Sequence, residues 1–116
     1  IGNLCKDRSR INPRDRIDSD IKGGLSGAPT QQLANELISQ TYRMYGDQLV
    51  IIGVGGIFSA ADAYEKIKRG ASLVQLITGM IYEGPQLIGE INIGLVKLLR
   101  EDGFNHVSEA IGIYHK

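Results

Sequence analysis

The residues best suited to chemistry in this sequence are three glycine-rich turns that could bring backbone amides to an anion. They are Gly-Gly-Leu-Ser-Gly at residues 23–27, Gly-Gly at residues 55–56 and Thr-Gly at residues 78–79. Glycine has no Cβ atom, so the backbone can take positive φ angles and a phosphate can approach it closely. Ser26 and Thr78 could add hydroxyl donors. The pattern predicts a site for a phosphorylated ligand held mainly by backbone groups.

Other chemistries find little support in the sequence. A P-loop needs Gly-Lys-Ser/Thr, which is absent, and the Gly-x-Gly-Gly run at residues 53–56 lacks the third glycine of the dinucleotide fingerprint. His106 and His115 have no metal-ligand spacing, and Cys5 has no base that can be assigned to it. We therefore expect no catalytic residue and no metal site in this segment.

The elements that must position the turns follow from the apolar pattern. Apolar residues recurring every three or four positions predict helices, and continuous apolar runs are typical of parallel strands covered on both faces. The expected order is a strand stub at residues 1–3, a polar loop at 6–22, a helix at 31–45, a strand at 49–54, a helix between Ser59 and Gly70, a strand at 71–77, a short connection at 79–84 and a helix at 85–100.

Capping residues set the expected helix ends. Thr30 and Ser59 each precede a helix and carry hydroxyls that can accept its first free amides. Asp62 follows Ser59 by three residues, where a carboxylate can return to the cap and favour the positive helix end. Pro85 can open the next helix, because the first helical position needs no amide. Ser108 can cap a last turn at residues 107–111.

This order of elements predicts an α/β fold. Successive strands whose carboxyl ends carry small residues form the phosphate-binding end of many TIM (β/α)8 barrels. Two strands and a stub cannot close an eight-stranded barrel, and the sequence does not begin with Met. We therefore expect residues 1–116 to be the C-terminal part of a single TIM-barrel domain. A free-standing small α/β domain is the alternative, although its strand edges would be exposed.

Charge and hydropathy disfavour nucleic acid as the main partner and a membrane-spanning helix within this sequence. The 13 basic and 13 acidic residues give a net charge of zero, so no basic excess indicates nucleic acid as the main partner. No apolar run approaches the roughly 20 residues that a membrane-spanning helix needs.

Several motifs together are similar to those of the dihydroorotate dehydrogenase family. They are residues 23–27, Ile-Ile-Gly-Val-Gly-Gly-Ile at 51–57, Glu-Lys-Ile at 65–67 and Gly-Ala-Ser-Leu-Val-Gln at 70–75. The tail, Ala-Ile-Gly at 110–112 followed by His115, resembles the quinone-linked class 2 branch. The resemblance implies a TIM barrel with FMN over the carboxyl ends of its strands. It also implies oxidation of dihydroorotate to orotate in pyrimidine biosynthesis, with a membrane quinone as electron acceptor.

The resemblance assigns roles to five residues of this sequence. Gly27, Gly56, Ile77 and Thr78 are expected to hold the phosphate region of FMN, largely through backbone groups. Asn3 is expected to contact the substrate. The next residue, Leu4, stands where the family carries a threonine beside this asparagine.

The remaining parts of the enzyme are expected outside this segment. The catalytic serine, a flavin-contacting lysine and the quinone-tunnel helices belong to preceding sequence. Peripheral association with the bacterial inner membrane or the mitochondrial inner membrane would come from there as well. Two alternatives stay open: another FMN-dependent TIM-barrel oxidoreductase, and a non-enzymatic module that binds a phosphorylated ligand.

Overall fold

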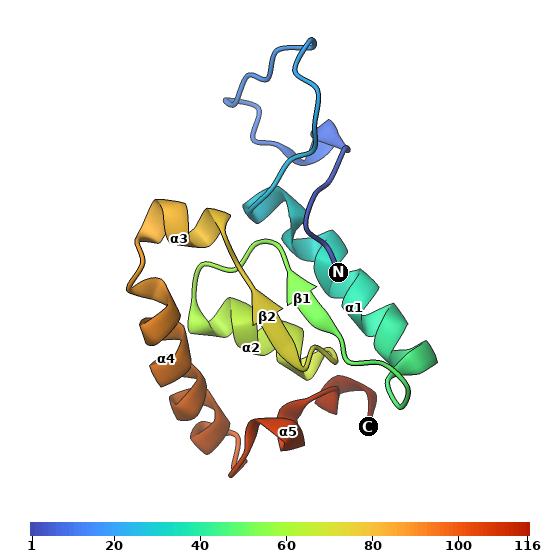
Figure 1. Ribbon diagram of the computed structural model, residues 1–116, viewed down its shortest axis with the longest axis vertical. Coiled ribbons are helices and arrows are strands. Elements are labelled where there is room, and N and C mark those ends of the chain that lie inside the picture. Colours follow the sequence, from blue (N-terminus) through green and yellow to red (C-terminus); the bar gives the residue numbers. More distant parts are fainter.

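The computed structural model describes residues 1–116, apart from the side chain of Arg10. In chain order the elements are the 3-10 helices η1 (Arg8–Arg10) and η2 (Ala28–Thr30), helix α1 (Gln31–Tyr45), strand β1 (Ile52–Val54), helix α2 (Ala60–Lys68), strand β2 (Leu73–Gln75), helices α3 (Thr78–Glu83), α4 (Leu87–Glu101) and α5 (Val107–Ala110), and the 3-10 helix η3 (Ile113–His115). Figure 1 shows their arrangement around the two strands.

The two strands pair in parallel, with Ile52 opposite Leu73 and Val54 opposite Gln75. The N-terminal residue adds to this sheet. The Ile1 nitrogen donates to the Ile52 carbonyl at 2.7 Å, and the Val54 amide donates to the Ile1 carbonyl at 2.9 Å. These alternating bonds are those of a parallel ladder, so the expected strand stub lies beside β1.

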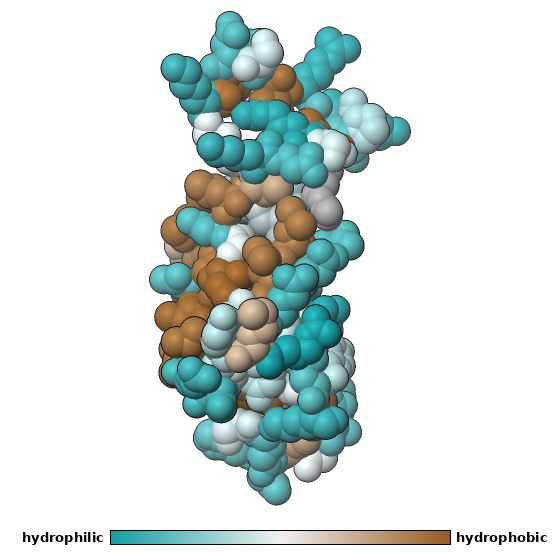
Figure 2. Space-filling model, turned by 90° about the vertical axis from the view of Figure 1, so that its right-hand side faces the viewer, coloured by the Kyte–Doolittle hydropathy of each residue, from teal (hydrophilic) through white to brown (hydrophobic). Residues whose placement is uncertain are grey.

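Helices cover one face of the sheet and leave the other bare. On the covered face, a Cβ atom added to Gly53 would lie 2.9 Å from Ile38 Cδ1 of α1 and 3.1 Å from Lys66 Cδ of α2. Figure 1 shows α2 running behind the two strands. On the other face, Ile52 and Leu73 are 41% and 59% exposed. Figure 2 shows a broad apolar area below the polar loop.

The core consists of three small clusters, two of which include residues of α2. Their buried members are Ile57, Ala63, Leu87 and Ile91; Tyr64, Ile67, Leu99 and Ala110; and Ile38, Ile51 and Ala71. Val74, on the covered face of β2, packs against the first two clusters. The helices and the sheet therefore hold the carboxyl ends of both strands in fixed positions.

The two expected caps before α1 and α2 have different outcomes. Ser59 Oγ accepts the Asp62 amide at 3.2 Å, which confirms the cap of α2. The cap prediction for Thr30 is wrong, because η2 runs directly into α1 and gives Thr30 helical dihedral angles. Its hydroxyl donates instead to the Gly27 carbonyl at 2.7 Å.

Later helix ends also differ from expectation. Helix α4 begins at Leu87, so Pro85 lies in the turn before it. Helix α5 is capped by His106 and not by Ser108, since His106 Nδ1 accepts the Ser108 amide at 3.2 Å while the Glu109 carboxylate returns to the backbone. The expected connection at residues 79–84 forms most of α3.

Both strands are shorter than expected. Residues 49 and 50, included in the first predicted strand, are exposed and precede β1. The parallel ladder starts only where the Ser72 amide reaches the Ile51 carbonyl at 2.8 Å. Apolar character alone did not reveal where pairing begins, because pairing depends on the neighbouring strand.

The polar loop projects from the body of the molecule (Figure 1). Its base is closed by an antiparallel bridge between Cys5 and Leu25, with N–O distances of 2.9 and 2.6 Å. Within the loop, Arg8 Nη2 donates to the Ile21 carbonyl at 3.0 Å. The bridge ties the N-terminal segment to the first glycine-rich turn, so both reach the same end of the sheet.

Candidate anion-binding site

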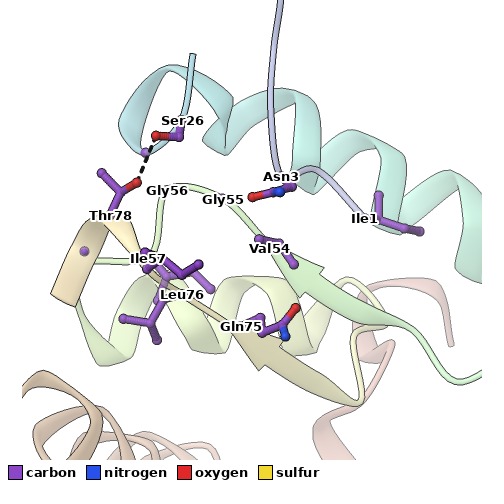
Figure 3. Close-up of a pocket in the computed structure, with 13 residues that line it drawn as sticks. Ile1, Asn3, Ser26, Val54, Gly55, Gly56, Ile57, Gln75, Leu76 and Thr78 are labelled. Carbon is purple, nitrogen blue, oxygen red and sulfur yellow. Dashed lines mark hydrogen bonds between the residues drawn. The ribbon is translucent and has the colours of Figure 1, made fainter. Parts of the chain in front are cut away.

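A cavity of about 560 Å³ lies at the carboxyl ends of the strands, and Figure 3 shows the residues that line it. All five residues expected to bind ligand are among them: Asn3, Gly27, Gly56, Ile77 and Thr78. The N-terminal segment, the turn before η2, the turn after β1 and the start of α3 each contribute. The structure therefore brings together sequence positions that are up to 78 residues apart, counting from Ile1 to Gly79.

The first and third glycine-rich turns meet at one edge of the cavity. Ser26 Oγ and Thr78 Oγ1 are 2.9 Å apart and share a hydrogen bond (Figure 3). A Cβ atom added to Gly27 would lie 2.8 Å from Thr78 Cγ2. Two hydroxyls and the adjacent backbone are thus concentrated at this edge.

The second turn requires glycine at both of its positions. Gly55 and Gly56 have φ angles of 101° and 69°, which residues with a side chain rarely adopt. A Cβ atom on Gly55 would collide with Thr30 Oγ1, and one on Gly56 would collide with Gln31 Cβ. The turn therefore packs directly against the start of α1, and only glycine, which has no side chain, fits at these two positions.

Backbone amides at all three turns are available to a ligand. Those of Gly27, Gly56 and Thr78 donate to no acceptor within the described chain. Buried or partly buried amides are normally paired, so unpaired ones around a cavity indicate a ligand that accepts hydrogen bonds.

The lining has no ionisable side chain among the described residues. Amides and the hydroxyls of Ser26 and Thr78 are its donors, together with the side-chain amides of Asn3 and Gln75. This part of the chain can therefore bind and orient an anion, but it offers no acid–base pair. The described residues also hold no cluster of His, Cys, Asp or Glu that could bind a metal ion.

Asn3 and its neighbour Leu4 face different surroundings. Asn3 lines the main cavity, whereas Leu4 lines a second cavity of about 260 Å³ against α1. Leu4 is 60% exposed. The leucine at the family's threonine position is therefore outside the lining of the main cavity.

Sequence reasoning missed the polar network behind the second turn. Gln31 Nε2 donates to the Gly56 carbonyl at 2.7 Å and to Asp62 Oδ1 at 2.8 Å. Asp62 Oδ2 accepts the Phe58 amide and the Ser59 hydroxyl, both at 3.0 Å. Asp62 was expected only to cap α2, but it also joins α2 to α1. No local sequence signal could reveal a bond between residues 31 positions apart.

A buried lysine behind β1 was missed as well. Lys66 is 0% exposed, and its Nζ donates to Asn35 Oδ1 at 2.7 Å. Burial lowers the pKa of Lys66 to about 8, although the nearby Asp62 charge opposes the shift. Lys66 is absent from the cavity lining, so its contribution is to the packing of α1, α2 and β1.

Comparison with known proteins identifies relatives over most of the chain. A sequence model of the family described as dihydroorotate dehydrogenase matches residues 2–99. The dihydroorotate dehydrogenase (quinone) of Nautilia profundicola is 49% identical over 100 residues, which are 85% of this chain and 28% of that protein. The protein of the same name from Deinococcus radiodurans is 49% identical over 112 residues, which are 97% of this chain and 30% of that protein.

Solved structures agree with these sequence matches. The ligand-free DHODH crystal structure from Eimeria tenella superimposes with a TM-score of 0.84 at 34% identity, covering 95% of this chain and 30% of that one. A DHODH complex with ferulenol from the same organism gives a TM-score of 0.79 at 38% identity, covering 84% and 26%. The expected fold is confirmed: the chain is part of an α/β barrel, which explains why one face of its sheet is bare. The chain spans less than a third of the length of these relatives.

Proposed function

The chain belongs to the dihydroorotate dehydrogenase family, and we propose that it forms the FMN phosphate-binding end of a quinone-linked dihydroorotate dehydrogenase. The observation that carries the proposal is the convergence of three glycine-rich turns on one cavity, with unpaired amides at Gly27, Gly56 and Thr78. Relatives named dihydroorotate dehydrogenase (quinone) support the class of enzyme.

The residues present fit the terminal phosphate of FMN. A phosphate needs several donors at close range, and the turns offer amides together with the paired hydroxyls of Ser26 and Thr78. The absence of a Cβ atom at Gly27 and Gly56 keeps the backbone accessible. Ile77 is 69% exposed and lines the cavity beside Thr78, where its backbone can take part whatever its side chain is.

The roles of the chain's own residues follow from their positions. Gly27, Gly56, Ile77 and Thr78 would fix the phosphate and so set the position of the whole cofactor. Asn3, on the N-terminal side of the cavity, would hydrogen-bond the planar ring or carboxylate of the substrate. Bound FMN supplies two-electron chemistry, coupling the oxidation of dihydroorotate to orotate with the reduction of a quinone to a quinol.

The remainder of the activity is proposed to lie in sequence outside this segment. It would supply the base that removes a proton from dihydroorotate, the quinone site and the contacts with a bacterial or mitochondrial inner membrane. No helix of the described chain combines the length and apolar character needed to cross a bilayer. Residues 1–116 would then be the C-terminal portion of one FMN-binding barrel domain.

Turnover by the full-length protein tests this proposal. It should oxidise dihydroorotate with a soluble quinone analogue as acceptor, and much more slowly with fumarate or NAD. Flavin-containing protein that ignores dihydroorotate would instead favour another FMN-dependent barrel oxidoreductase. A flavin-free protein that binds other phosphorylated ligands would favour the non-enzymatic module.

A further inference from the structure

We infer that Gln31, held in place by Asp62, is a positioning residue that fixes the Gly55–Gly56 turn for the phosphate. The inference rests on the proposed function, because it assigns to Gln31 a role in that same site. Gln31 is not itself expected to contact the ligand, since it is absent from the residues that line the cavity. It acts through the peptide group that follows Gly56.

The orientation of Gln31 is determined by its partners. The Gly56 carbonyl and Asp62 Oδ1 are both acceptors, at 2.7 and 2.8 Å, so the side-chain amide must present its nitrogen to them. Asp62 is fixed in turn, because its other oxygen accepts from Phe58 and Ser59 at 3.0 Å. The cap of α2 thus holds the carboxylate, and the carboxylate holds Gln31.

The bond from Gln31 sets the direction of one peptide group in the turn. It draws the Gly56 carbonyl toward α1. In a trans peptide the following amide points the opposite way, and the described chain has no cis peptide bond. The Ile57 amide therefore points away from Gln31, and it donates to no acceptor in the part of the chain that the structure describes.

Without this bond the peptide could rotate. Gly56 has no Cβ atom and tolerates a wide range of dihedral angles, so nothing in its own chemistry holds one orientation. A rotated peptide would turn the carbonyl oxygen from Gln31 toward the cavity side, where its negative end would repel a phosphate. Fixing the dipole before binding is the general way in which proteins stabilise charge in a site.

The residue before Gln31 acts similarly on another turn. Thr30 is 1% exposed and its hydroxyl donates to the Gly27 carbonyl at 2.7 Å. The start of α1 therefore holds a carbonyl from each of two glycine-rich turns. Residues 30 and 31 together fix the relative positions of these turns.

Three variants of the full-length apoprotein test the inference. Gln31→Met keeps side-chain length without a donor. Gln31→Lys keeps a nitrogen with several N–H groups, which can donate to both the Gly56 carbonyl and Asp62. Gln32→Met is the matched control, because Gln32 is the next residue of α1 and donates to Glu36 at 3.0 Å on the exposed side. The measurements are the Kd values of FMN and of riboflavin, which lacks the phosphate, together with the melting temperature of each apoprotein.

We expect Gln31→Met to weaken FMN binding about tenfold or more, as for loss of one well-oriented bond to a charged group, while riboflavin stays within about twofold. Gln31→Lys and Gln32→Met should keep the parent's preference for FMN. Equal weakening of FMN and riboflavin binding by Gln31→Met, or failure of this variant to fold, would overturn the inference by assigning Gln31 a general structural role. Unchanged FMN binding would overturn it by assigning Gln31 no role in the site. A parent protein that binds riboflavin as tightly as FMN would instead refute the phosphate site and the proposed function.

Discussion

Replacing Gly56 by alanine in the full-length protein should impair FMN binding strongly. Gly56 has a φ angle of 69°, and left-handed backbone costs a residue with a side chain about 1–2 kcal/mol. The new Cβ atom would also collide with Gln31 Cβ, so the turn must move. A displaced turn loses at least one bond to the phosphate, and a hydrogen bond to a charged group is worth about 1.5–3 kcal/mol.

The expected result is an FMN Kd about ten- to a hundredfold higher than that of the parent. Titration of the apoprotein with FMN, followed by quenching of flavin fluorescence, measures it. Gly103→Ala is the matched control. Gly103 has a φ of 81°, so the backbone penalty is similar, but an added Cβ atom would meet nothing within 4 Å and the residue is absent from the cavity lining. Equal FMN affinity in the two variants would refute the role of the turn.

Three further predictions concern the substrate, pH and folding. Asn3→Ala should lower kcat/KM for dihydroorotate about ten- to a hundredfold with FMN retained; steady-state values within about twofold of the parent would remove the substrate role. Burial lowers the pKa of Lys66 from 10.5 to about 8, so between these two pH values the unfolded state binds more protons than the folded state. The free energy of unfolding of the parent should therefore rise with pH across this window by about 3 kcal/mol relative to that of Lys66→Met. A flat difference between their unfolding free energies across the window would contradict this. Residues 1–116 alone should show no cooperative thermal transition, because Ile52 and Leu73 are exposed on the bare sheet face; a sharp transition would argue for an independent domain.

Local sequence patterns predicted much of the fold. The apolar periodicity located the three long helices, and the run of apolar residues before each glycine cluster located β1 and β2. The glycines identified the cavity, because positive φ angles and close backbone approach both require the residue without a Cβ atom. These features depend on neighbours along the chain, which is why they could be predicted.

The features that the sequence did not reveal depend on contacts between distant segments. The sequence predicts Thr30 as a helix cap, but the preceding 3-10 turn redirects its hydroxyl to the Gly27 carbonyl. Gln31 and Asp62 meet only because α1 and α2 pack on the same side of β1. Lys66 lies in the same layer and is buried, although lysine is rarely buried completely. Tertiary packing decided each of these cases.

Anaerobic addition of dihydroorotate to the purified full-length protein tests the central claim most directly. The protein should carry FMN in equimolar amount, identified after release by denaturation. Dihydroorotate alone should bleach that flavin and yield an equal amount of orotate, and a quinone analogue should restore the flavin absorbance. A protein without FMN, or with FMN that dihydroorotate does not reduce, would contradict the assignment.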